Sequence, residues 1–250
     1  MEKNYRLLKN RATVRQYSDK NISEQLLIDL LETSFRSSNT GNMQVYSVVV
    51  TRDEEMKKQL APCHFNQPMI VQAPIVLTFC ADFNRFTKWC EYNKAIPGYD
   101  NFLSFITATI DATIVAQTFA IAAESKGLGI CYLGTTNYFA EKISSILHLP
   151  RFVVPITTIT VGYPASIPNQ TDRLPTRSLV HYEQYTDYTE DAIRNMYAEK
   201  ENLPEMKQFV LDNKKETLAQ VFTDVRYTKS NNETFSAMLL SFLQKQGFRV

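Results

Sequence analysis

The chain has 250 residues, of which 44% are hydrophobic and 21% are charged, and its formal net charge is +1. A chain of this length buries roughly 70–75% of the surface that it exposes when unfolded, so it can form a large core without disulfides or metals. The balanced charge argues against a nucleic-acid-binding protein, which usually carries a basic excess. The 12% aromatic content excludes a disordered chain.

The sequence predicts a cytoplasmic protein that does not cross a membrane. Its first eleven residues include no apolar stretch of the kind found in a signal peptide. Two long uncharged runs, 62–81 and 152–171, are interrupted by prolines and amides, which argues against membrane helices. The four cysteines form no C-x-x-C pair, which favours a reducing compartment.

The first hundred residues predict alternating helices and strands. Residues 2–9 favour a short helix, and Ser23 is placed to cap a second helix whose leucines share one face. The β-branched run 45–50 predicts a strand, and Asp53 is placed to cap a helix that extends to residue 60. The apolar run 74–81 is typical of a strand that is buried on both faces.

Residues 101–126 predict one helix of about 39 Å that is apolar on almost every side. Asp111 and Gln117 interrupt it, which argues against a bilayer-spanning helix. A helix that is apolar all round belongs in the middle of a large core or at a subunit interface. Gly127 and Gly129 are expected to end it.

The rest of the chain predicts strands at 130–133 and 153–163. Between them, Asn137 is placed to cap a short helix that Pro150 ends. After residue 163 the sequence becomes irregular and then charged and helical, and it ends in an amphipathic helix over 232–247. We therefore expect a single α+β domain over residues 1–250, in which 164–250 form an irregular and helical C-terminal extension.

The sequence contains no clear signature of a side-chain catalyst or a metal site. Cys63 and His64 are adjacent, and neighbours in a chain rarely face each other as nucleophile and base do. The three histidines form no H-E-x-x-H motif. Neither the G-x-G-x-x-G motif nor a P-loop occurs, so a bound nucleotide would need another kind of site.

Two features could bind a phosphorylated ring compound. Arg11 and Arg15 flank Thr13, and guanidinium groups offer the fork of donors that suits a phosphate. Small polar loops at 39–44, Gln67, 132–135 and Arg173 could bring backbone N–H groups close to a flat polar ring. Taken singly, the arginines are explained more often by a solvated basic face, and each loop is an ordinary turn.

The order of these motifs along the chain resembles the FMN-dependent nitroreductase family, in particular its NADPH-linked oxygen-insensitive nitroreductases and flavin reductases. The resemblance covers about residues 1–185, and residues 245–248 match again. The matching motifs are Arg11-x-Thr13-x-Arg15-x-Tyr17, 38–44, Gln67-Pro68, 79–85, Asp111-Ala112, 122–134, Leu149-Pro150, 161–164 and 173–175.

The resemblance implies a nitroreductase-like α+β fold with a central, mostly antiparallel sheet flanked by helices. It implies a homodimer with FMN sites at the subunit interface and with the long buried helix 101–126 at that interface. The implied reaction is ping-pong hydride transfer from NADPH or NADH, through bound FMN, to nitroaromatics, quinones or flavins. The flavin carries this chemistry, so the resemblance implies no catalytic side chain.

The resemblance also assigns roles to the candidate residues. The phosphate and ribityl end of FMN is implied to contact Arg11, Ala12, Thr13, Arg15 and, from the extension, Arg173. The flavin ring is implied to lie beside Asn39, Thr40 and Gly41 of the partner subunit, and beside Gln67, Tyr132, Leu133, Gly134 and Thr135.

The sequence departs from the family pattern at two positions and leaves alternatives open. Relatives often carry a basic residue where Ala12 and Thr171 stand, which removes one or two charges from the phosphate site. Residues 186–231 do not settle whether NADPH or NADH is preferred. A flavoenzyme of the same superfamily with a narrow substrate, dehalogenase-like or flavin-fragmenting, remains an alternative. So does a flavin- or partner-binding module without useful turnover.

Overall fold

The computed structural model describes the backbone of residues 2–250 and the side chains from Tyr5 onward. The chain divides into two compact units, one comprising Met1–Gln170 with Phe235–Val250 and the other Thr171–Thr234. The sequence predicts that the extension begins at residue 164, seven residues before the smaller unit begins at Thr171. The interpretation of the whole chain as one domain stays a prediction.

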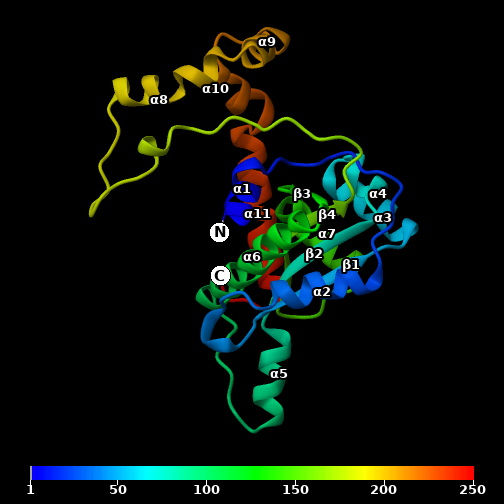
Figure 1. Ribbon diagram of the computed structural model, residues 1–250. Coiled ribbons are helices and arrows are strands. Elements are labelled where there is room, and N and C mark those ends of the chain that lie inside the picture. The colour runs from blue at the N-terminus through cyan, green and yellow to red at the C-terminus, as the bar shows by residue number, and fades with distance from the viewer. Residues whose placement is uncertain (1) are drawn as a thin grey trace. The chain divides into compact units, whose positions relative to one another are not determined.

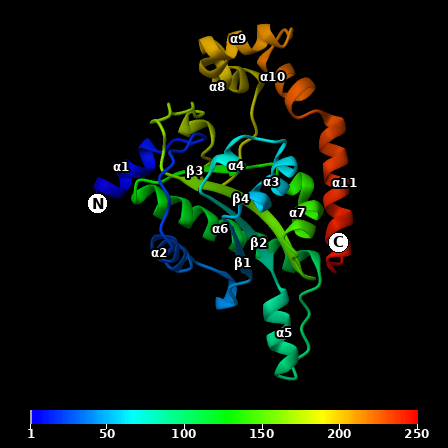
Figure 2. The same ribbon diagram turned by 90° about the vertical axis from the view of Figure 1, so that its right-hand side faces the viewer.

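The larger unit is built on a four-stranded sheet with the strand order β1-β2-β4-β3 (Figures 1 and 2). All three strand pairs are antiparallel, in agreement with the predicted antiparallel sheet. The two inner strands are buried along almost their whole length, as the apolar run 74–81 predicts. The strands are β1 (Tyr46–Thr51), β2 (Ile75–Asp82), β3 (Gly129–Leu133) and β4 (Val153–Gly162).

Helices cover both faces of the sheet because alternate side chains of its strands are apolar on both sides. On one face, Leu77 and Phe79 of β2 join a large core with the long helix α6 (Phe102–Ser125). On the other face, Val76 of β2 joins a smaller core with α3 (Glu54–Leu60), α4 (Met69–Gln72) and α7 (Ala140–Ile146). Figure 1 shows these helices on opposite sides of the strands, with α5 projecting away from the sheet.

The helix α6 confirms the helix predicted over 101–126. Asn101 caps its first turn by accepting a hydrogen bond from the backbone N–H of Ser104 at 3.0 Å. The chain then leaves the helix at Gly127, whose φ of +78° suits a residue without a side chain. In the part of the chain that the structure describes, α6 alone is long and apolar enough to span a membrane. Its packing against β2 and β4 identifies it as a core helix.

Two of the predicted caps are confirmed and one is wrong. Ser23 and Asp53 cap α2 and α3 with their side chains. Asn137 caps no helix, because the chain forms a 3₁₀ turn over Thr136–Phe139 before α7 begins at Ala140, so Asn137 lies inside that turn.

The helices of the larger unit are α1 (Glu2–Asn10), α2 (Glu24–Ser34), α3 (Glu54–Leu60), α4 (Met69–Gln72), α5 (Asn84–Tyr92), α6 and α7 (Ala140–Ile146). The last helix, α11 (Lys229–Lys245), belongs to this unit from Phe235 onward.

The smaller unit consists of an irregular segment followed by short helices. These are α8 (Glu190–Asn202), α9 (Pro204–Asp212), α10 (Leu218–Val221) and a π-helical turn over Phe222–Arg226. A capping box formed by Thr217 and Gln220 begins α10. An ion pair of 2.8 Å joins Lys200 of α8 to Asp172 at the start of the irregular segment.

Candidate functional site

The segment after α1 lies along the free edge of β3. The backbone N–H of Val14 donates to the carbonyl oxygen of Ile130 at 3.0 Å. The hydroxyl of Tyr17 lies 2.7 Å from Oγ1 of Thr160 on β4. Burial raises the pKa of Tyr17 above its usual value, so the hydroxyl stays a proton donor. These contacts fix the backbone that carries Arg11, Ala12, Thr13 and Arg15.

Two glycines make this close approach possible. Gly129 and Gly162 lie opposite each other in the β3–β4 ladder. A Cβ atom at Gly129 would lie 2.4 Å from Cγ2 of Val14, and one at Gly162 would lie 2.6 Å from Cδ1 of Tyr17. Any larger residue at either position would push the arginine-bearing segment away from the sheet.

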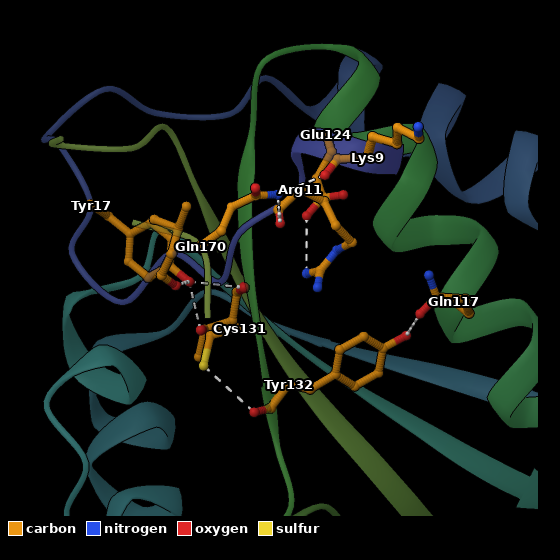
Figure 3. A network of polar contacts seen from close by, with 10 residues as sticks. Lys9, Arg11, Tyr17, Gln117, Glu124, Cys131, Tyr132 and Gln170 are labelled. Atoms are coloured by element: carbon orange, nitrogen blue, oxygen red, sulfur yellow. Dashed lines mark hydrogen bonds and ion pairs between the residues drawn. The ribbon is translucent and has the colours of Figure 1, made fainter. Parts of the chain in front are cut away.

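Arg11 lies between the sheet and the end of α6. Its Nη2 forms an ion pair of 3.2 Å with Oε1 of Glu124, which is nine-tenths buried (Figure 3). Burial raises the pKa of Glu124, and the charge of Arg11 opposes that rise. Figure 3 also shows Tyr132 on this side of β3, where its hydroxyl lies 3.3 Å from Oε1 of Gln117.

Arg15 follows Val14 in this segment and is exposed. Burial raises the pKa of the Cys131 thiol, and the nearby charge of Arg15 opposes that rise. A cavity of about 380 Å³ opens beside the free edge of β3. Its lining includes Arg11, Ala12 and Glu124, so the structure places two of the predicted phosphate-site residues in one hollow.

A second group of candidate residues meets where β3 ends. The predicted backbone contacts Tyr132, Leu133, Gly134 and Thr135 form this end of the strand and the turn after it. Nδ1 of His64 lies 2.8 Å from Oγ1 of Thr135, and the N–H of Gln67 donates to the carbonyl of His64 at 3.1 Å. His64 therefore links Gln67 to the Thr135 turn. The sequence favours a surface histidine at position 64, and this prediction is wrong, because the side chain is completely buried.

The loop with Asn39, Thr40 and Gly41 is held by a buried carboxylate. Asp111 on α6 is 1% exposed and accepts hydrogen bonds from the backbone N–H and hydroxyl of Thr40 at 3.0 and 3.1 Å. Gly41 has a φ of +56°, which the loop needs to turn back. The sequence marks Asp111 as an interruption of the apolar helix and as part of the Asp111-Ala112 motif of the family, without a role. Its isolation among apolar residues is typical of a buried polar anchor.

This loop is not joined to the other candidate residues within one chain. In the described part of the chain, no hydrogen bond or ion pair connects residues 39–41 with Arg11–Arg15 or with the Tyr132–Thr135 turn. The larger unit thus brings together the arginine segment and the Gln67–Thr135 group along β3, while Asn39, Thr40 and Gly41 lie at another part of α6.

The sequence model of one family matches residues 8–163, which is more than half of the chain, and its description is the nitroreductase family. The chain belongs to the nitroreductase family. The match spans the sheet, α6 and every candidate residue except Arg173. The family resemblance and the nitroreductase-like α+β fold predicted from the sequence are therefore confirmed.

Other nitroreductase-type proteins agree with this assignment. An FMN reductase (NADPH) from Bacillus subtilis is 30% identical over 184 residues, which cover 73% of this chain and 74% of that protein. The crystal structure of a candidate oxidoreductase from Bacteroides fragilis has a TM-score of 0.97 and 58% identity, and covers 98% of this chain and 100% of that one. The NfrA1 nitroreductase from B. subtilis has a TM-score of 0.84 and 25% identity over 98% of each chain.

Arg173 lies outside the part of the chain that the nitroreductase model matches. It belongs to the smaller unit, where its Nη1 donates to Oγ1 of Thr171 and to the carbonyl of Asp172, both at 2.7 Å. Its side chain is exposed, and no acidic side chain among the described residues pairs with it. The role of Arg173 at a phosphate stays a prediction.

Proposed function

We propose that this nitroreductase-family protein is an FMN-dependent oxidoreductase that takes hydride from NADPH or NADH. The electrons then pass to a nitroaromatic, a quinone or a flavin by a ping-pong mechanism. The observation that carries the proposal is the alignment of the Arg11–Arg15 segment and the Gln67–Thr135 group along one strand, β3. The FMN reductase (NADPH) and nitroreductase names of its relatives support the choice of cofactor and donor.

The residues along β3 fit an FMN molecule. Arg11, Thr13 and Arg15 offer cationic and hydroxyl donors for a phosphate. The hollow of about 380 Å³ that Arg11 and Ala12 help to line falls within the size range of ligand sites. The turn from Tyr132 to Thr135 offers backbone N–H groups to a polar ring, and Gln67 adds a side-chain amide. Arg173 is the proposed second phosphate contact.

When bound, FMN supplies the hydride acceptor and donor that no side chain of this protein provides. The protein's own work is to bind and orient. Arg15 places positive charge near the anionic end of the cofactor, Arg11 adds donors oriented by Glu124, and the backbone at the end of β3 holds the ring in one orientation. No side-chain acid or nucleophile is needed, which agrees with the buried, neutral state of His64.

We also propose that the protein is a cytoplasmic homodimer with α6 at the interface. Apolar side chains recur along one stripe of α6 and stay exposed in the single chain, with Leu103 at 74%, Ile110 at 51% and Ile114 at 37%. An exposed apolar stripe on a core helix marks a contact with another protein surface. In such a dimer, Asn39, Thr40 and Gly41 would reach the ring bound by the partner subunit.

The test is to replace Arg15 and Arg173 together with alanine. Each hydrogen bond to a charged group contributes about 1.5–3 kcal/mol, so we expect the Kd for FMN to rise at least about hundredfold. The control is the double variant Lys88→Ala and Arg194→Ala, which removes two exposed positive charges, one from each compact unit. Full retention of FMN by the Arg15 and Arg173 variant would contradict the phosphate assignment.

A further inference from the structure

His64 ends a 3₁₀ turn over Ala61–His64 and is completely buried. The two residues after it, Phe65 and Asn66, both have a φ of +53°, so the chain reverses sharply. The reversal lets the N–H of Gln67 reach the carbonyl of His64. The position of Gln67 therefore depends directly on where His64 is held.

Two contacts hold this turn against the turn that follows β3. One is polar, the 2.8 Å hydrogen bond between Nδ1 of His64 and Oγ1 of Thr135. The other is aromatic, because the ring of Phe65 lies 5.4 Å from that of Phe139 and 6.3 Å from that of Tyr138, measured between centroids. The polar contact and the aromatic contact can be removed separately.

The imidazole of His64 is held in its neutral form. Burial lowers its pKa to about 4, and no charged group opposes or adds to that effect. Its Nε2 is buried with no hydrogen-bond partner among the residues described. An unpaired buried nitrogen costs free energy, and an apolar side chain of similar size would fill the same space without that cost. The imidazole of His64 therefore provides one thing that an apolar side chain of similar size could not, which is the hydrogen bond to Thr135.

We propose that His64 is a positioning residue whose hydrogen bond to Thr135 sets the spacing between Gln67 and the Tyr132–Thr135 backbone. These are the two stretches that contact the flavin ring under the proposed function, on which this inference rests. A site that holds a reacting ring loses rate and affinity when its supporting contacts leave it loose by about 1 Å. His64 would thus act on the flavin through Thr135 without touching it.

The experiment compares Thr135→Val with Thr135→Ser, and His64→Ala with His64→Asn. Two quantities are measured on the whole protein: the Kd for FMN and the rate at which NADPH reduces bound FMN without oxygen. We expect Thr135→Val and His64→Ala each to raise the Kd for FMN, to lower the reduction rate, or to do both, by about tenfold or more. The conservative Thr135→Ser and His64→Asn variants should recover most of that loss, and the double variant His64→Ala with Thr135→Val should be no worse than either single one.

A matched control separates positioning from packing. Phe65→Leu weakens the aromatic contact between the same two turns but leaves the His64–Thr135 hydrogen bond. We expect it to lower the Tm while the reduction rate stays within about twofold. If Phe65→Leu slows reduction as much as Thr135→Val does, the role of His64 is only packing and the inference is overturned.

The remaining outcomes are also decisive. The inference is overturned, and the proposed function stands, if the wild-type protein binds FMN and the Thr135→Val and His64→Ala variants match it in both measurements. Wild-type protein that fails to bind FMN would overturn both. If His64→Ala does not fold, the Thr135→Val and Thr135→Ser pair decides alone.

Discussion

Arg11 and Arg15 differ in what surrounds them. Arg11 is a quarter exposed and already pairs with the buried carboxylate of Glu124, so the pair carries little net charge toward an incoming anion. Arg15 is exposed, and no acidic side chain among the described residues pairs with it. A phosphate would therefore gain more from the charge of Arg15, while Arg11 offers oriented donors held by Glu124. This difference is why the variant that tests the phosphate site removes Arg15.

At the same scale, His64 makes the stability of the protein depend on pH. The pKa of His64 is lowered from 6.5 to about 4 by burial. Between these two values the unfolded chain binds a proton at this ring that the folded chain does not, so the free energy of unfolding falls as the pH falls. The difference in pKa corresponds to about 3 kcal/mol over the whole window.

We therefore expect His64→Asn to flatten the pH dependence of stability. Between pH 7 and pH 4.5, its free energy of unfolding should fall by about 2 kcal/mol less than that of the wild-type protein, as measured by urea denaturation. His148→Asn is the matched control, because His148 is exposed and its φ of 52° suits asparagine. Equal pH dependence in the His64→Asn variant and the wild type would contradict the neutral, buried imidazole.

At the scale of elements, the site depends on how the segment 11–17 packs against β3. Val14 and Tyr17 occupy the space that Gly129 and Gly162 leave free. The contact at Gly129 cannot yield easily, because the nearest atoms are Cβ and the two Cγ atoms of Val14, which lie close to the backbone. The glycines thus control the position of both arginines from the neighbouring strands.

Gly129→Ala should therefore lower the free energy of unfolding by about 1–3 kcal/mol through overpacking, and it should weaken FMN binding because the arginine segment shifts. Adding Val14→Gly should recover part of the loss in FMN binding, because it removes all three atoms that the new methyl group would meet. The control is Gly98→Ala, because nothing lies within 4 Å of a Cβ atom at Gly98. If Gly129→Ala binds FMN and unfolds as the wild type does, the close approach of Val14 does not position the site.

Local signals explain which elements the sequence predicts correctly. The caps at Ser23 and Asp53 and the apolar runs of β2 and α6 each depend on residues within one element. Asn137 does not cap α7 because it lies inside a 3₁₀ turn that comes before this helix. Thr136, in the same turn, donates to the carbonyl of Leu133. The hydroxyl of Thr136 also lies 3.1 Å from Oγ1 of Thr158 on β4, and this contact between distant residues leaves no mark in the local sequence pattern.

The contacts that build the site join distant parts of the chain. The hydrogen bonds between Thr40 and Asp111 and between His64 and Thr135 each connect residues 71 apart, and Arg11 and Glu124 are 113 apart. Periodicity cannot predict such pairs, because they follow from the order of strands in the sheet. The family resemblance supplied the candidate residues and included Asp111 and Glu124 in its motifs without a role. The structure shows that His64, Asp111 and Glu124 hold the candidate residues in place.

At the scale of the whole molecule, the exposed stripe of α6 predicts a homodimer. Ile110→Glu places a charge in the middle of this stripe, and burying an unpaired charge costs several kcal/mol. We expect the variant to be a monomer by size-exclusion chromatography with light scattering, with reduced FMN content because the partner's loop is lost. Ile28→Glu, on the exposed side of α2, is the matched control and should leave the mass unchanged. A monomeric wild type, or a dimeric Ile110→Glu variant, would contradict the proposed interface.

The most direct test of the account is the visible absorption spectrum of the purified protein, before and after NADPH is added without oxygen. The site along β3 predicts a flavin band that bleaches when the bound cofactor is reduced. The band should return when a nitroaromatic or a quinone is added, as a ping-pong mechanism requires. The absence of a flavin band even after FMN is added would contradict the cofactor site, and a band that neither NADPH nor NADH bleaches would contradict the proposed activity.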